Sequence, residues 1–276
     1  MSATSTYVGL TRADGAATGE PERFSPSGQR TFARVVPADH VQAAALATVM
    51  ANGCFEAHVV EDASPVGQGL AQLVQREARR RRLDLTGRDT LGDDPEARRS
   101  LAARIGRSEA DCVLLAAAAP PPQAAALLRE LGDVRPGMRF YATAAFADEA
   151  FARTVPGTVA PQLRIATPTL APEAYPAAGR RVLAALRARH GRAPDIRALY
   201  GYEALRAVLR AIEDAGDLGN DRAEVVRAFF GMDDRDSVLG TYDVDDNGDI
   251  TLRVYGLQRI RNGELAFDGV VEPEPA

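Results

Sequence analysis

Between residues 32 and 168, apolar and polar positions follow two alternating patterns. Short apolar runs predict buried strands at residues 55–60, 83–85, 111–116, 140–143 and 163–167. Longer stretches with apolar residues three or four positions apart predict helices at residues 41–50, from 65 onward, 95–105 and 124–131. This alternation predicts an α/β fold with a parallel sheet and helices on both of its faces.

The pattern changes after residue 168. Three helices are predicted without intervening strands, at residues 175–189, 198–215 and 222–230. The second of them carries an apolar stripe made of Leu199, Tyr202, Leu205, Val208, Leu209 and Ile212. Residues 238–244, 250–260 and 264–270 then alternate like antiparallel strands. Turns are expected at 245–248 and at 261–263, where Asn262-Gly263 is typical of a hairpin.

Residues 32–82 form the unit around which the chain is organised, in the order helix, strand, loop, helix. The strand ends at the acids Glu61 and Asp62, and Ser64-Pro65 opens the next helix. In open parallel sheets, ligands bind outside the carboxyl ends of the strands. The loop at residues 62–67 is therefore predicted to form part of any ligand site.

Composition describes an ordinary globular protein of one large or two modest domains, with 276 residues, 46% hydrophobic and 26% charged. The formal net charge of −5 argues against general nucleic-acid binding. All basic residues are arginine and none is lysine. This excludes a catalytic lysine or a Schiff base.

Neither targeting signals nor cysteines in this sequence identify the cellular compartment of the protein. No apolar run reaches the roughly 18 residues of a membrane span. The first residues have neither the charged start nor the apolar core of a signal peptide. Cys54 and Cys112 both fall at the start of predicted strands. We expect reduced, buried thiols, with a disulfide as the alternative if those strands are neighbours.

Four segments carry a resemblance to a known family: FARVVPADHVQAAALA, VVEDASPVGQGLAQ, ALYGYEALRAVLRAIEDAG and GTYDVDDNGDITLRVYGLQRIRNGEL. In order and spacing the chain resembles the branched-chain amino-acid-binding type of periplasmic solute-binding protein. The resemblance implies a type I periplasmic-binding-protein fold, in which two flavodoxin-like lobes joined by three crossings close on a ligand.

The resemblance also implies an unusual division of the chain. Residues 33–168 and 236–276 would form a complete C-terminal-type lobe, and residues 1–32 and 172–234 the remainder of the N-terminal-type lobe. Three strand-helix units that precede the first ligand loop in the family have no counterpart. We therefore expect either a fragment of a longer product or an exposed apolar patch that leads to self-association.

Two segments match ligand loops of the family. Ser2, Ala3 and Thr4 match the loop that holds the carboxylate and ammonium of an amino-acid ligand; the alternative is a disordered terminus. The segment from Ser64 to Gly67 matches the place where an aromatic residue often closes over the ligand, and here Val66 stands in that position. The amides at residues 67–69 could receive an anion or simply begin a helix.

The loops after the third and fourth strands depart further from the family. The loop after the third strand, residues 117–121 with Pro120, has no counterpart of the aromatic residue that the family usually contributes there. The loop after the fourth strand, residues 142–146 with Phe146, has no counterpart of the family's acid that pairs with the ligand's ammonium. Asp148 and Glu149 are possible substitutes for that acid. A buried ammonium without a carboxylate costs several kcal/mol. The resemblance thus implies a ligand that is amino-acid-like or less polar.

Other patterns are weaker. Residues 243–248 copy the start of a calcium loop, but Val254 stands where a bidentate Glu is needed, so a turn is expected. Residues 67–72 resemble a dinucleotide fingerprint with Gln72 replacing the third glycine. The arginines at 79–82 are typical of a solvated helix end. The three histidines show no metal-ligand spacing. We predict no metal site, no cofactor and no catalytic residues.

The function predicted from the sequence is therefore a non-enzymatic solute-binding module of an ABC transporter, which would act with a permease or a signalling partner. The alternative is a degenerate module for protein–protein interaction, such as a sensor domain of a kinase, without a small-molecule ligand. The resemblance implies an extracytoplasmic location.

Overall fold

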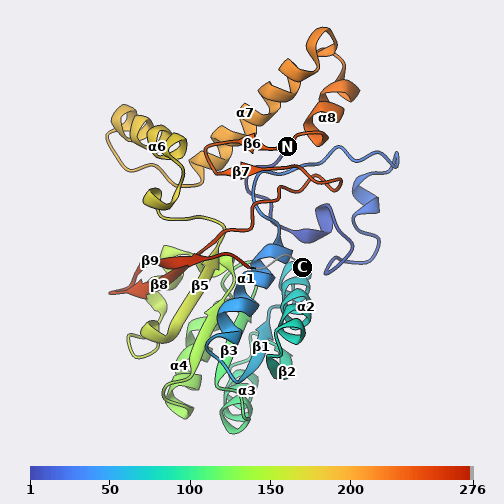
Figure 1. Ribbon diagram of the computed structural model, residues 1–276. Coiled ribbons are helices and arrows are strands. Elements are labelled where there is room, and N and C mark those ends of the chain that lie inside the picture. The colour runs from blue at the N-terminus through green and yellow to red at the C-terminus, as the bar shows by residue number, and fades with distance from the viewer. Residues whose placement is uncertain (274–276) are drawn as a thin grey trace. The chain divides into compact units, whose positions relative to one another are not determined.

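The computed structural model describes residues 1–273, which divide into two compact units (Figure 1). The sheet unit comprises Asp39–Pro168 and residues 254–273, and the helical unit comprises Met1–Ala38 and Thr169–Arg253. These boundaries lie near those implied by the resemblance without coinciding with them. No helix in the described part of the chain is long and apolar enough to cross a membrane.

Seven strands form the sheet of the sheet unit within the described residues. They are β1 (Glu56–Glu61), β2 (Asp84–Thr90), β3 (Cys112–Ala116), β4 (Arg139–Ala142), β5 (Leu163–Thr167), β8 (Tyr255–Arg261) and β9 (Glu264–Val271). Their order is β2-β1-β3-β4-β5-β8-β9. The first five are parallel, and β8 and β9 run antiparallel at one edge.

Helices cover both faces of this sheet. They are α1 (Asp39–Ala51), α2 (Pro65–Arg80), α3 (Pro95–Arg107), α4 (Ala124–Val134) and the short α5 (Glu149–Thr154). Every residue of β3 is buried, as expected of a strand covered on both sides. Val60 and Leu115 belong to the core that Leu101 of α3 and Leu127 of α4 also line. The predicted parallel sheet with helices on both faces is thus confirmed.

Local sequence signals explain where several elements begin and end. Ser64, Asp94 and Asp148 are the N-cap residues of α2, α3 and α5, and each side chain accepts a backbone N–H of its helix. Asn262 and Gly263 have φ angles of 54° and 79°, as the tight turn between β8 and β9 requires. The predicted hairpin is confirmed.

The edge strand β2 is longer than the apolar run at residues 83–85 predicts. It extends to Thr90 through polar residues that alternate between exposed and half-buried positions. Strand β1 supplies its backbone partners from Glu56 to Glu61. A polar edge strand of this kind is difficult to recognise from hydrophobicity, because only one neighbour covers it.

The helical unit contains α6 (Ala177–His190), α7 (Ala198–Asp214) and α8 (Arg222–Phe230), with a small pair of strands, β6 (Arg235–Asp236) and β7 (Thr241–Tyr242). Of the strand predicted at 238–244 only β7 is formed, and the strand predicted at 250–260 begins at Tyr255, as β8. Val238, Leu239, Val244 and Ile250 are buried in the core of this unit. Their alternation therefore reflects packing of irregular chain and not a continuous ladder.

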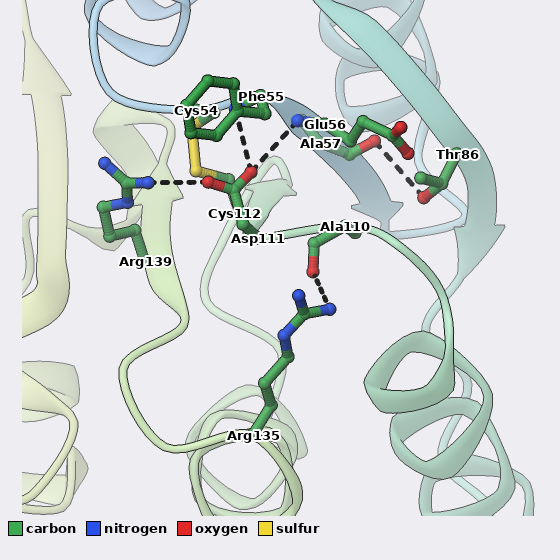
Figure 2. Close-up of a disulfide and its surroundings, with 10 residues drawn as sticks. All are labelled: Cys54, Phe55, Glu56, Ala57, Thr86, Ala110, Asp111, Cys112, Arg135 and Arg139. Atoms are coloured by element: carbon green, nitrogen blue, oxygen red, sulfur yellow. Dashed lines mark hydrogen bonds and ion pairs between the residues drawn. A yellow bond between two sulfur atoms is a disulfide. The ribbon is translucent and has the colours of Figure 1, made fainter.

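A disulfide joins Cys54, in the turn between α1 and β1, to Cys112 at the start of β3, with the two Cα atoms 5.9 Å apart (Figure 2). The preferred expectation of reduced thiols is wrong, because β1 and β3 are neighbours in the sheet. Asp111 holds the same turn, since its Oδ1 accepts the N–H groups of Phe55 and Glu56, both at 3.0 Å.

Candidate functional site

Asp62 connects two loops at the carboxyl end of the sheet. It follows β1 directly, and its Oδ1 accepts the backbone N–H of Ser64 at 3.1 Å and the Ser64 hydroxyl at 2.5 Å. Its Oδ2 accepts the N–H of Ala118, in the loop after β3, at 2.9 Å. The loops after β1 and β3 are thereby fixed to each other at the edge where ligands of parallel sheets bind.

The start of α2 is a closely packed helix cap. The Ser64 hydroxyl accepts the N–H of Gly67 at 3.0 Å, and the Ser64 carbonyl accepts that of Gln68 at 3.0 Å. A Cβ on Gly67 would lie 1.9 Å from Asp62 Oδ1 and 2.9 Å from the Ala116 carbonyl oxygen. Because Ser64 already satisfies these amides, ordinary capping explains the segment and an anion is not required.

The loop after β4 is joined to the same edge. Thr143 is buried, and its hydroxyl accepts the N–H of Ala117 at 3.3 Å. The N–H of Ala144 donates to Gln42 Oε1 at 3.3 Å, and Gln42 is a buried residue of α1. The carboxyl ends of β1, β3 and β4 therefore form one connected set of loops, which we call the carboxyl-edge loops (residues 62–67, 117–121 and 143–146).

The residues predicted for this region have different environments. Ser64, Val66 and Pro120 are half-buried at the carboxyl-edge loops, so part of each remains open to solvent. Phe146 is almost fully buried and packs edge-to-face on Phe151, with ring centroids 5.1 Å apart. The Phe146 side chain therefore belongs to the hydrophobic core, and it does not line a ligand surface in this structure.

Ser2, Ala3 and Thr4 lie in the helical unit and are ordered by backbone pairing. The N–H of Ser2 donates to the Ala33 carbonyl at 2.8 Å, and the Ser2 carbonyl accepts the N–H of Val35 at 3.0 Å. The Ser2 hydroxyl accepts the N–H of Ser5 at 3.0 Å. The alternative of a disordered terminus does not describe this segment.

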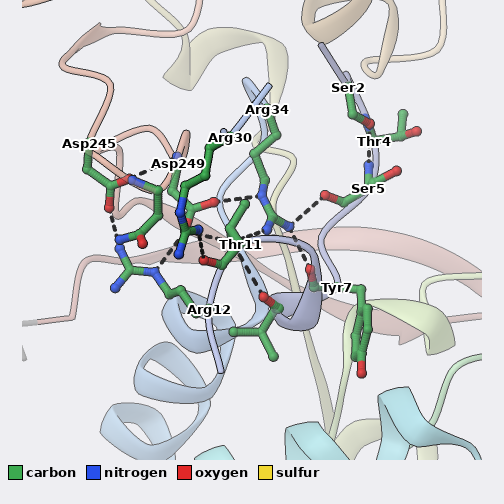
Figure 3. A network of polar contacts seen from close by, with 12 residues as sticks. Ser2, Thr4, Ser5, Tyr7, Thr11, Arg12, Arg30, Arg34, Asp245 and Asp249 are labelled. Atoms are coloured by element: carbon green, nitrogen blue, oxygen red, sulfur yellow. Dashed lines mark hydrogen bonds and ion pairs between the residues drawn. The ribbon is translucent and has the colours of Figure 1, made fainter. Parts of the chain in front are cut away.

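Arg34 is the centre of a buried polar network in the helical unit (Figure 3). Its Nε donates to Asp249 Oδ1 at 2.8 Å, and its Nη1 donates to the carbonyls of Ser5 and Tyr7 at 2.8 and 2.9 Å. Thr11 accepts a further bond from Arg34 Nη2 at 2.5 Å. The network joins segments far apart in the sequence, and every contact of Arg34 is made within the protein.

The segment that resembles a calcium loop is a turn, as predicted. The N–H of Gly248 donates to the Asp245 carbonyl at 2.8 Å, and Asp245 Oδ1 accepts the N–H of Asn247 at 2.9 Å. Arg12 forms ion pairs with both Asp245 and Asp249. Arginine side chains thus neutralise the carboxylates that a calcium ion would need.

One further group in the described residues has the spacing of metal ligands, namely Cys54, Asp111 and Cys112. Both sulfur atoms are bonded to each other in the disulfide, and Asp111 pairs with Arg139 at 2.6 Å. A thiolate is the form of cysteine that binds a metal. This group therefore does not fit a metal ion in the oxidised protein.

His58 is a residue of β1, and its side chain contacts the edge strand β2. Its Nε2 is 2.8 Å from Asp89 Oδ2 and its Nδ1 is 3.0 Å from the Thr86 hydroxyl. Burial lowers the pKa of His58 below its ordinary value; Asp89 acts in the opposite direction, and Arg104 adds to the lowering. The side chain has no exposed face for proton transfer to a ligand, so it is a structural residue.

Sequence reasoning did not identify Asp62, Gln42 and Thr143 as residues that fix the carboxyl-edge loops. Asp62 carried a usable signal, because it is an acid directly after a buried strand and two residues before a helix cap. Gln42 carried none, since its role depends on where α1 packs.

Comparison with known proteins identifies the family. The profile of the periplasmic binding protein family matches residues 6–264. No curated protein matches the sequence. A leucine-binding protein, LivK, from Thermotoga maritima has 20% sequence identity and a TM-score of 0.73, with 90% of this chain and 70% of that chain covered.

Two other solved structures show the range of similar proteins. The branched-chain amino-acid transporter substrate-binding protein LivJ from Streptococcus pneumoniae, in complex with isoleucine, has 16% identity and a TM-score of 0.65, covering 86% of this chain and 66% of that one. A solute-binding protein from R. palustris, in complex with benzoate, has 16% identity and a TM-score of 0.65, covering 87% and 65%. The chain spans about two thirds of the length of these structures.

The match over residues 6–264, together with the parallel sheet and its covering helices, shows that the fold is the type I periplasmic-binding-protein fold. The chain belongs to the periplasmic binding protein family.

Proposed function

We propose that the chain is the ligand-binding module of an ABC transporter substrate-binding protein and that the carboxyl-edge loops contact the ligand. The observation that supports this most directly is the connection of three loops through Asp62 and Thr143 at the carboxyl edge of the sheet. Loops that are already ordered lose less conformational entropy when a ligand binds. Ser2, Ala3 and Thr4 are proposed as further contacts on family resemblance. The family consists of solute-binding proteins, so binding and not catalysis is the proposed role.

The ligand class is proposed from the side chains at these loops. Val66 and Pro120 are apolar and half-buried, and Asp62 is already engaged by three donors. Three of the roughly four acceptor positions of the Asp62 carboxylate are therefore already used, which leaves little capacity for pairing with a ligand's ammonium. We propose a small ligand with an apolar body, amino-acid-like or less polar. Solved proteins of this fold have been found with leucine, isoleucine and benzoate.

A thermal-shift screen tests the proposal with three probe sets: branched-chain amino acids, uncharged aliphatic amides without an amino group, and aromatic or aliphatic carboxylic acids. A ligand at a hundredfold excess over its dissociation constant stabilises the folded state by about 2.7 kcal/mol and raises the melting temperature. The variant Val66→Asp should abolish that shift, whereas Glu96→Ala, at an exposed position of α3, should not.

The result decides the ligand class. A shift with the acids or the amides and not with the amino acids supports a less polar ligand. A shift with the amino acids alone supports an amino-acid-like ligand. No shift with any probe would overturn the proposed function in favour of a protein-interaction module.

A further inference from the structure

Helix α7 is apolar on two opposite sides. Its inner side contributes Leu199, Ala207 and Ala211 to the core of the helical unit. Its outer side carries Tyr202, Leu205, Leu209 and Ile212, whose side chains are between 40 and 61% exposed. We call these four residues the α7 stripe. A helix that is apolar on both sides is typical of a buried position, so the stripe needs a partner.

The spacing of the α7 stripe indicates that the partner is another helix. The residues follow one another at intervals of three, four and three, which is the seam of a two-heptad coiled coil. The stripe is also symmetric about Ala207. Tyr202 and Ile212 are equally far from Ala207 in sequence, and so are Leu205 and Leu209.

We propose that a second copy of this chain docks on the α7 stripe, with the two α7 helices antiparallel. The twofold axis would cross the stripe at the height of Ala207 along the helix. In this arrangement Leu205 packs on the partner's Leu209, and Tyr202 packs on the partner's Ile212. A twofold interface requires a self-complementary surface, and the symmetric stripe is one.

Charges beside the stripe fit the same arrangement. Arg206 and Glu213 lie on one flank of α7, seven residues or about 10.5 Å apart along the axis. Antiparallel pairing about Ala207 places Glu213 only about 7.5 Å along the axis from the partner's Arg206. Glu213 then lies closer along the axis to the partner's Arg206 than to Arg206 of its own helix.

The helix ends point to an antiparallel neighbour as well. Helix α7 has no acidic residue in its first turn and no basic residue in its last turn, and it ends at Asp214. This is unfavourable for the helix dipole of α7 alone. Arg210 already forms an ion pair with Asp214 at 2.9 Å. An antiparallel neighbour brings the positive end of its own dipole close to Glu213 and Asp214 and adds to this compensation.

The expected dimer is weak. The α7 stripe exposes on the order of 400 Å² of side-chain surface per copy, which is within the range of the largest apolar patch on a typical monomer and small for a specific interface. We therefore expect an equilibrium between monomer and dimer that changes with concentration. This expectation does not depend on the ligand proposed above.

Sedimentation equilibrium of the full chain, from micromolar to sub-millimolar concentrations, tests the proposal. The mass should rise from monomer toward dimer, and Leu205→Glu should weaken dimerisation at least tenfold. Phe55→Glu is the matched control, because Phe55 is an exposed apolar residue of the sheet unit. A monomer at every concentration, or a dimer that Leu205→Glu leaves unchanged, would overturn the proposal. It would indicate that something other than a second copy of this chain covers the α7 stripe.

Two further sets of variants, charge exchanges and cysteine substitutions, test the antiparallel register. Arg206→Glu and Glu213→Arg should each weaken the dimer, and the double exchange should restore it. Tyr202→Cys combined with Ile212→Cys should form an intermolecular disulfide, whereas Tyr202→Cys alone should not. Efficient crosslinking of the single variant would indicate a parallel pair and contradict the proposed geometry.

Discussion

Gly67 is a single residue on which the carboxyl-edge loops depend. Replacing it with alanine places a methyl group 1.9 Å from Asp62 Oδ1, so the carboxylate must move away from Ser64 and Ala118. We expect Gly67→Ala to lower the free energy of unfolding by about 1–3 kcal/mol. Urea denaturation measures the change. Gly201→Ala is the matched control, because a Cβ there meets no atom within 4 Å, and it should stabilise its helix slightly.

A second prediction about a single residue concerns His58 and the pH dependence of stability. Because burial lowers the pKa of His58, its neutral form is favoured in the folded protein, with Asp89, Thr86 and Arg104 as its polar neighbours. The stabilisation is present above the unfolded-state pKa of about 6.5 and is lost as the pH falls below it toward the folded-state pKa. His58→Gln should therefore flatten the decrease in melting temperature between neutral and mildly acidic pH.

His190 supplies the control for this measurement. It lies at the exposed end of α6, so His190→Gln should leave the pH profile of the melting temperature unchanged. If His58→Gln shows the same acid-induced decrease as the unmodified protein, protonation of His58 is not its cause.

At the scale of elements, the Cys54–Cys112 disulfide ties the turn before β1 to the start of β3. The bond closes a loop whose ends are 58 residues apart, for which loop-closure entropy gives a stabilisation of about 4 kcal/mol. Treatment with a reductant should therefore lower the melting temperature by many degrees, as circular dichroism would show. The double variant Cys54→Ala with Cys112→Ala should melt at the lower temperature with or without reductant; continued sensitivity would contradict this account.

At the scale of the whole molecule, buried ion pairs join segments that are distant in sequence. Arg34 is fully buried and pairs with Asp249, and it also binds the carbonyls of Ser5 and Tyr7. Removing one partner leaves an uncompensated buried charge, so Arg34→Ala should cost about 3–5 kcal/mol of unfolding free energy. The exposed pair of Arg197 with Asp195 offers the comparison, and Arg197→Ala should change the stability by less than about 1 kcal/mol. Equal effects in denaturant titrations would contradict the role given to Arg34.

The sequence by itself determined most of the sheet unit. Buried parallel strands such as Cys112–Ala116 are continuous apolar runs, and the caps at Ser64 and Asp94 precede helices that begin with proline. These signals are local, so they can be read without knowing the fold. The Asn262-Gly263 hairpin is local in the same way, because both residues adopt positive φ. The family resemblance also followed from sequence alone.

The tertiary structure decided what depends on neighbours. Cys54 pairs with Cys112 because β1 and β3 are adjacent, and Arg34 is neutralised by a residue 215 positions away. Phe146 enters the core although its loop resembles a ligand loop, and Asp62 connects two loops that sequence spacing does not place together. Periodicity reports which face of an element is buried, but it carries no information about which distant residue covers that face. That information arises only when the strands take their order in the sheet.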